Sequence, residues 1–119
     1  MTELSEAVIA VGEKIHIVMR RHFKEDIRRH FAGTVTAVSE ALVRADGYTF
    51  VFNPATTEYR RLPELRTRIF GILDSGYIMN VLPQNVEIAR LRYHANLGAP
   101  VLSDGSGFHL EVNEMNAAS

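Results

Sequence analysis

Residues 31–37 read FAGTVTA, and this stretch decides the fold class. Phe31, Gly33 and Val35 alternate with small or hydroxylated residues, and such a period of two places successive side chains on opposite faces of a strand. Valine and threonine also favour strands, because their branched side chains pack well on a pleated surface. The stretch is therefore predicted to be a β-strand with one apolar face.

The same alternation extends outward from this strand in both directions. Upstream, Ile15, Ile17 and Met19 alternate with other residues and predict a strand, which a charged connection at residues 22–29 joins to the next one. Further strands are predicted at residues 42–52, 68–73, 77–82 and 86–93, followed by a hairpin that joins 101–102 to 108–112.

Turn signals separate these strands. Residues 53–57 read NPATT, a composition typical of a turn, and Asp46–Gly47 is expected to mark a bulge or a turn within the third strand. Residues 58–66 contain Pro63 and are interpreted as a long excursion from the sheet. Residues 68–73 are apolar nearly throughout, which predicts a strand buried on both faces.

A short amphipathic helix is predicted over residues 2–11, before the first strand. A helix this short is unstable alone, so it is expected to pack on the strands or on a neighbouring copy. One helix followed by five or six short, locally connected strands favours a mainly β fold. The expected architecture is a small, strongly bent antiparallel β-barrel with a short N-terminal α-helix.

Length and composition predict a single domain and exclude several protein classes. The chain has 119 residues, expected to divide into the helix at 1–12, the barrel at 13–93 and a C-terminal extension at 94–119. It has no cysteine, so it has no disulfide framework, no thiol nucleophile and no thiolate metal site. No apolar run reaches the roughly 18–20 residues of a membrane span. A cytoplasmic protein without a membrane partner is expected.

No residues have the spacing of a catalytic or metal site. The five histidines are scattered, and His16 alternates with two isoleucines, so it is expected to face solvent or a partner. Ser103, Ser106 and His109 lie near Asp104, but a turn rich in glycine and serine does not hold a nucleophile and a base in fixed geometry. The chain is therefore expected to be non-enzymatic, with no catalytic residues, no metal and no cofactor.

Arginine clusters are the most suggestive feature of the sequence. Residues 14–68 hold eleven of the 13 basic residues but six of the 14 acidic ones, so a basic centre lies between acidic ends. Arginine beside an aromatic residue can hold phosphates and stack on bases. The candidate anion- or RNA-binding residues are Arg20, Arg21, Arg28, Arg29, Tyr59, Arg60, Arg61, Arg66 and Arg68. Alternatively, these arginines form ion pairs with Glu25, Asp26, Glu58 and Glu64 and keep strand edges from aggregating.

Three short motifs point to a known family. Phe31-Ala32-Gly33 lies in the second strand, a variable loop spans about residues 54–66, and Gly76 lies in the tight turn between the last two barrel strands. With the order of the elements over residues 2–93, they resemble the Sm-like fold of RNA-associated ring proteins. The resemblance implies a five-stranded bent barrel and ring assembly. The positions by which that family contacts RNA bases are occupied here by Ser39, Leu42, Val43 and Ser75, so the base-reading residues do not carry over.

Two functions follow from these features. The first is a non-enzymatic, oligomeric binding module of Sm-like fold that engages RNA or another anionic partner through an arginine-rich rim. The second is a structural or protein-interaction module without nucleic-acid binding. In both, a homo-oligomer assembled through strand edges is expected, because one small barrel does not easily hide the apolar surface of the helix and strands.

Overall fold

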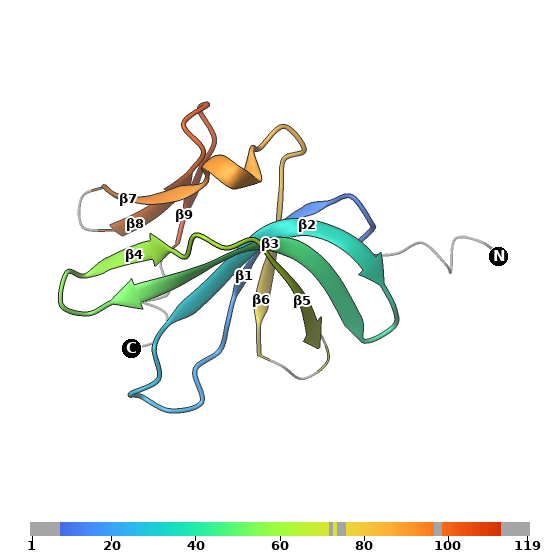
Figure 1. Cartoon of the computed structure of the whole chain (residues 1–119), viewed down its shortest axis with the longest axis horizontal. Coiled ribbons are helices and arrows are strands. Elements are labelled where there is room, and N and C mark those ends of the chain that lie inside the picture. The colour runs from blue at the N-terminus through green and yellow to red at the C-terminus, as the bar shows by residue number, and fades with distance from the viewer. Residues whose placement is uncertain (1–7, 72, 74–75, 97–98, 113–119) are drawn as a thin grey trace.

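The computed structural model describes residues 8–71, 73, 76–96 and 99–112, and strands dominate their regular structure (Figure 1). In chain order the elements are β1 (Lys14–Val18), β2 (Arg29–Val38), β3 (Leu42–Asn53), β4 (Glu58–Arg61), β5 (Arg66–Gly71), β6 (Ile78–Leu82), the 3₁₀ turn η2 (Ile88–Arg90), β7 (Arg92–Asn96), β8 (Ala99–Ser103) and β9 (His109–Glu111). Within the described residues, no helix is long and apolar enough to cross a membrane. The predicted mainly β, antiparallel fold class is confirmed.

The larger of two sheets contains the first six strands. Its order is β4-β3-β2-β1-β6, with antiparallel pairing throughout, and β5 also pairs with β3. β4 pairs with residues 50–53 of β3 and β5 with residues 42–47, so both strands lie along the same edge of β3. The long β3 is thus the frame on which one side of the sheet is assembled.

This sheet curls, so that its two edges approach each other. β5 and β6 lie on opposite edges of the sheet, yet only residues 72–77 connect them. The ring of Phe70 in β5 lies 5.0 Å from that of Phe31 and 6.3 Å from that of Tyr77, just before β6. Among the described residues no strand pairing joins β5 to β6. The predicted closed barrel is therefore not found, and the sheet is open but strongly curled.

A close approach of two backbones allows the two longest strands to curve together. Gly33 of β2 and Gly47 of β3 are directly opposite each other. A Cβ atom on Gly33 would lie 2.3 Å from the carbonyl oxygen of Asp46, and one on Gly47 would lie 2.0 Å from that of Ala32. No side chain fits at either position, so glycine is required there for steric reasons.

The inner face of the curl holds the first hydrophobic core. Alternate residues of β1, β2 and β3 point into it, together with one aromatic ring from β5. Its buried members are Ile9, Ile15, Ile17, Phe31, Val35, Val43, Ala45 and Phe70.

A second sheet covers the outer face of the first. Its order is β7-β8-β9, and it lies against β4 and the central strands (Figure 1). The core between the two sheets contains Ala32, Phe50, Leu82, Val86, Leu91 and Leu102. Because both of their faces are covered, β1 and β2 are buried on both sides. His16 and His30 alternate with the inner-core residues and are therefore buried between the sheets.

Two expectations about β3 and its neighbours are wrong. Residues 58–66 do not leave the sheet, because β4 pairs with β3 and the amide of Leu62 donates to the carbonyl oxygen of Thr49 at 2.8 Å. Asp46–Gly47 does not interrupt β3. The bulge lies instead in β2, where the register shifts between Val35 and Ala37.

Other element predictions hold only in part. Residues 86–93 are not one strand but a turn, η2 and the start of β7, so the second sheet begins before residue 94. β5 is not buried on both faces, since it lies at an edge and Ile69 is 56% exposed. Residues 1–7 of the predicted helix lie outside the described residues, and residues 8–12 form bends and a turn rather than a helix.

Candidate functional site

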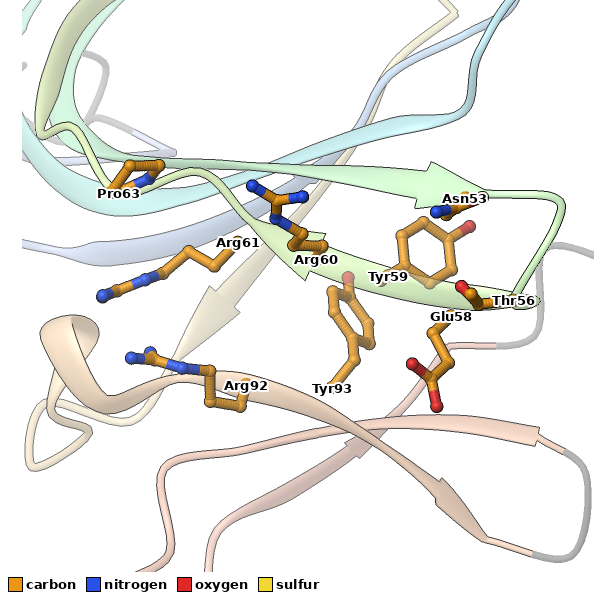
Figure 2. A pocket seen from close by; sticks show the side chains of 9 residues that line it. All are labelled: Asn53, Thr56, Glu58, Tyr59, Arg60, Arg61, Pro63, Arg92 and Tyr93. Atoms are coloured by element: carbon orange, nitrogen blue, oxygen red, sulfur yellow. The ribbon is translucent and has the colours of Figure 1, made fainter.

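A cavity of about 440 Å³ lies between β4, the turn before it and β7 (Figure 2). This volume is within the range of about 300–1,000 Å³ that holds small ligands. The cavity combines two tyrosines with three arginines. Its lining residues are Asn53, Thr56, Glu58, Tyr59, Arg60, Arg61, Pro63, Arg92 and Tyr93.

The hairpin between β3 and β4 positions one side of the cavity. Asn53 starts the turn, and its Oδ1 accepts a hydrogen bond from the amide of Ala55 at 2.9 Å. Thr57 takes a left-handed conformation with φ of 56°, which reverses the chain into β4. Alternation along β4 places Tyr59 and Arg61 on one face of the strand and Arg60 on the other. Figure 2 shows the Arg61 side chain extending toward the same side as Arg92.

The two tyrosines belong to a buried aromatic cluster between the sheets. The rings of Tyr59 and Tyr93 lie 4.6 Å apart, and the ring of His30 stacks on Tyr59 at 4.6 Å. Phe50 contacts Tyr93 edge-on at 5.2 Å. Because each ring is fixed by its neighbours, both tyrosines are held in place. Tyr59 is only 9% exposed, since His30 and Tyr93 cover its ring.

A chain of hydrogen bonds continues from Tyr93 into the protein. The amide nitrogen of Asn80 lies 3.3 Å from Nδ1 of His16, and Nε2 of His16 lies 2.7 Å from the Tyr93 hydroxyl. This hydroxyl also contacts Nδ1 of His30. Since an amide nitrogen only donates, Nδ1 of His16 accepts, its Nε2–H donates to Tyr93, and the tyrosine donates to His30. The arrangement requires a neutral His16.

The burial of His16 corrects the prediction that this residue faces solvent or a partner. Its side chain is fully buried, because the second sheet covers the outer face of β1. Burial, and then the neighbouring His30, lower the pKa of His16 from 6.5 to about 3. His16 is thus a neutral member of the core at physiological pH.

Two guanidinium groups lie side by side at the edge of the cavity. Nη1 of Arg61 donates to the carbonyl oxygen of Ala89 at 2.7 Å, and Nη1 of Arg92 reaches the same oxygen at 3.3 Å and that of Leu91 at 2.7 Å. Figure 2 shows the two side chains extending alongside each other. Arg61 also stacks over Tyr48, with 4.2 Å from its guanidinium carbon to the ring centre.

This arginine pair places two positive charges next to each other, and the one carboxylate among the cavity residues is that of Glu58. Partial desolvation and the charge of Arg61 lower the pKa of Arg92, while Tyr48 raises it. Within the described part of the chain, neither guanidinium forms an ion pair with a carboxylate. Two like charges that share a carbonyl acceptor are more stable when an anion binds between them.

The other predicted arginines do not lie in this cavity but at separate sites on the protein. Arg20, Arg21 and Arg29 border a separate cavity near residues 22–27, and Arg29 and Arg68 border a third one. Arg28 lies over the ring of Phe52 at 5.6 Å. Arg66 forms an ion pair with Glu64, as the alternative hypothesis expected. Of the predicted residues, only Tyr59, Arg60 and Arg61 come together in the arginine–tyrosine cavity.

Arg92 and Tyr93 were not predicted from the sequence. The sequence did contain a signal for them: Arg92 is adjacent to Tyr93, just as arginines follow the tyrosine in residues 59–61. They lie at the end of the strand predicted at residues 86–93, and the sequence indicates no role for them. The docking of β7 against β4 is what brings the two pairs to one cavity.

The turn between β8 and β9 has a structural role. The carboxylate of Asp104 accepts hydrogen bonds from the amide of Glu87 at 2.9 Å, the amide of Ser106 at 2.9 Å and the hydroxyl of Ser106 at 2.6 Å. These bonds lower the pKa of Asp104 to about 2. His109 contacts the carbonyl of Gly107 instead of either serine. Asp104 therefore ties this turn to the segment before η2.

Among the described residues, no three histidine or carboxylate side chains are grouped closely enough to hold a metal ion. Comparison of the chain with protein-family models, with curated proteins and with solved structures gives no match.

Proposed function

We propose that this chain is a non-enzymatic binding module that holds an anionic partner, RNA, in the cavity between β4 and β7. The observation that carries the proposal is the pair of Arg61 and Arg92, two adjacent guanidinium groups beside the Tyr59 and Tyr93 rings. Arginine binds phosphate oxygens through paired N–H groups, and the partly exposed ring of Tyr93 can stack on an unpaired base.

A single-stranded RNA fits this chemistry better than a duplex. Stacking on a tyrosine face requires a base that is not already stacked in a helix, and the site is a concave cavity rather than a flat surface. The contacts come from phosphate-binding and stacking groups, so recognition with little dependence on base identity is expected.

The test is fluorescence anisotropy with a short labelled oligouridylate over a series of salt concentrations. The wild type should bind, and affinity should fall steeply as salt rises. Arg61→Gln and Arg92→Gln should each weaken binding and reduce the slope of log K against log salt by about 0.7, the value for one phosphate on a single strand. Arg44→Gln is the matched control, because Arg44 is exposed on β3 away from the cavity. Absent or salt-independent binding would remove the proposal.

The Sm-like relationship, the single domain, the cytoplasmic location and the homo-oligomeric state belong to the same proposal. Support comes from the curled antiparallel sheet and from apolar side chains exposed on the edge strands, including Ile69, Ile78 and Val81. Strand edges with exposed apolar residues favour pairing with another chain.

The same exposed edges support the second candidate, a structural module that does not bind nucleic acid. In that case Arg60 and Arg61 are ion-pair partners between subunits, and Arg66 already pairs with Glu64 within the chain. Charge reversal at Arg60 and Arg61 should then change the oligomer mass in light scattering, while RNA binding is absent with and without the change. An unchanged mass would exclude this candidate.

A further inference from the structure

The cavity bordered by Arg29 and Arg68, of about 500 Å³, opens on the inner face of the curled sheet. It is bordered by β2, β3 and β5, and by residues next to β1 and β6. Its lining residues are Met19, Arg29, Thr49, Val51, Leu62, Arg68, Ile69, Phe70, Gly71 and Tyr77. None of them lines the arginine–tyrosine cavity, which lies between β4 and β7.

One wall of this inner cavity is apolar. Phe70 belongs to the first core, and Met19 and Tyr77 pack against the same core. Val51 and Leu62 continue the apolar wall along β3 and the segment after β4. A ligand that fills this space gains binding free energy, because apolar surface is removed from water.

Two cations border this apolar wall. Arg29 lies opposite Val51 across β2 and β3, and Arg68 lies opposite Ala45 across β3 and β5. The arginines therefore approach from strands on both sides of β3. No carboxylate is among the lining residues, and within the described residues neither arginine forms an ion pair.

One buried polar atom in the lining has no partner. Thr49 is only 4% exposed, and its Oγ1 atom is inaccessible to solvent. This atom makes no hydrogen bond to any described residue. The backbone of Thr49 is satisfied, since its carbonyl accepts from Leu62. A buried hydroxyl without a partner is unfavourable, and a rotation of the Thr49 side chain toward the cavity would let a ligand oxygen pair with it.

We propose that this inner cavity binds a small organic acid, a carboxylate carried on an apolar body. A hydrocarbon without charge would leave Arg29, Arg68 and the Thr49 hydroxyl unused. An inorganic anion would leave the apolar wall exposed to water. A carboxylate on a hydrocarbon chain matches both the polar groups and the apolar wall. Its oxygens would bind the two guanidinium groups and the hydroxyl, and its chain would pack against Val51 and Phe70.

The test is isothermal titration calorimetry of the full chain with decanoate below its micelle concentration. We expect saturable binding, with no comparable heat from 1-decanol, acetate or inorganic phosphate. Arg29→Gln and Arg68→Gln should each weaken decanoate binding about tenfold, the loss of a charge-assisted hydrogen bond. Thr49→Val keeps the shape of the side chain, so it should raise the melting temperature of the free protein and weaken binding.

The matched control is Arg61→Gln, which should leave decanoate binding unchanged while weakening RNA binding. The two proposals can therefore fail separately. Circular dichroism shows whether each variant is folded, and methyl NMR shifts at Val51 and Leu62 locate the ligand independently of any variant. The proposal is overturned if decanoate does not saturate, if 1-decanol binds equally well, or if folded Arg29→Gln and Arg68→Gln bind like the wild type.

Discussion

At the scale of single residues, Gly33 and Gly47 occupy positions where no larger residue fits. A Cβ on Gly47 would lie 2.0 Å from the Ala32 carbonyl oxygen, which is backbone and cannot rotate away. We expect Gly47→Ala to lower the free energy of unfolding by about 1–3 kcal/mol, as overpacking does in a rigid core. Gly71→Ala is the control, because a Cβ at that position would meet no atom within 4 Å, and it should change stability by less than about 0.5 kcal/mol. Urea unfolding measures both, and equal stability of the two variants would contradict the steric argument.

His16 makes stability depend on pH. Its pKa is about 3 when folded and near 6.5 when unfolded, so below pH 6.5 the unfolded chain binds a proton that the folded chain does not. Stability is therefore lost as pH falls through the window from 6.5 to 3. Between pH 7 and pH 5 the loss from this group should be about 2 kcal/mol.

Urea unfolding of the wild type and His16→Gln at several pH values measures this effect. Glutamine can keep a hydrogen bond to Tyr93 but cannot be protonated, so its stability should fall less over the same window. The comparison uses the slope and not the absolute stability, because the variant also loses packing. Parallel slopes would show that the proton taken up on unfolding belongs to another group.

The candidate site was predictable from the sequence only where its residues are neighbours. Tyr59, Arg60 and Arg61 lie on one short strand, so their chemistry could be seen in the sequence. Arg92 joins them through the docking of two strands far apart in the chain, which no local pattern encodes. His16 was misplaced because alternation shows that one face of β1 is apolar, but not whether another element covers the opposite face.

At the scale of elements, Tyr93 connects β7 to β1 and β2. Its hydroxyl bridges the two buried histidines, so Tyr93→Phe removes a hydrogen bond from each of them. We expect a loss of about 1–3 kcal/mol in the free energy of unfolding. Tyr48→Phe is the control, since the Tyr48 hydroxyl makes no hydrogen bond to any described residue. Thermal and urea unfolding compare them, and an equal effect of both changes would mean that the bridge contributes nothing.

Strands flanked by clear turns were predicted well, and two wrong predictions concern the two strands at the edge of β3. β1, β2, β3 and β6 match their predicted stretches, because one buried face imposes a period of two. Composition cannot separate an apolar edge strand from a central one, so β5 was expected to be buried on both faces. Pro63 is typical of an excursion from a sheet, but here it lies between β4 and β5, where the edge of β3 is shared by two strands.

At the scale of the whole molecule, the curl was predictable and the second layer was not. Consecutive short hairpins in one chain bend a sheet, and the six-residue connection from β5 to β6 requires its edges to approach. The second sheet consists largely of residues expected to extend from the barrel. The predicted hairpin of residues 101–102 with 108–112 is confirmed as β8 and β9, but no local pattern showed that it would pack on the first sheet. The second sheet nevertheless covers the outer face and forms one wall of the arginine–tyrosine cavity.

The open edges of the curled sheet lead to the last prediction. Val81 on β6 is 55% exposed and Ile69 on β5 is 56% exposed, so each edge strand carries an apolar residue. Pairing of such edges between copies would satisfy their backbone groups and cover these side chains, whereas lysine on an edge strand opposes pairing. We expect the wild type to form an oligomer in light scattering and Val81→Lys and Ile69→Lys to lower its mass. Val11→Lys is the control, because Val11 is equally exposed but lies in the turn before β1. A monomeric wild type, or a mass that only the Val11 variant changes, would show that these edges do not mediate assembly.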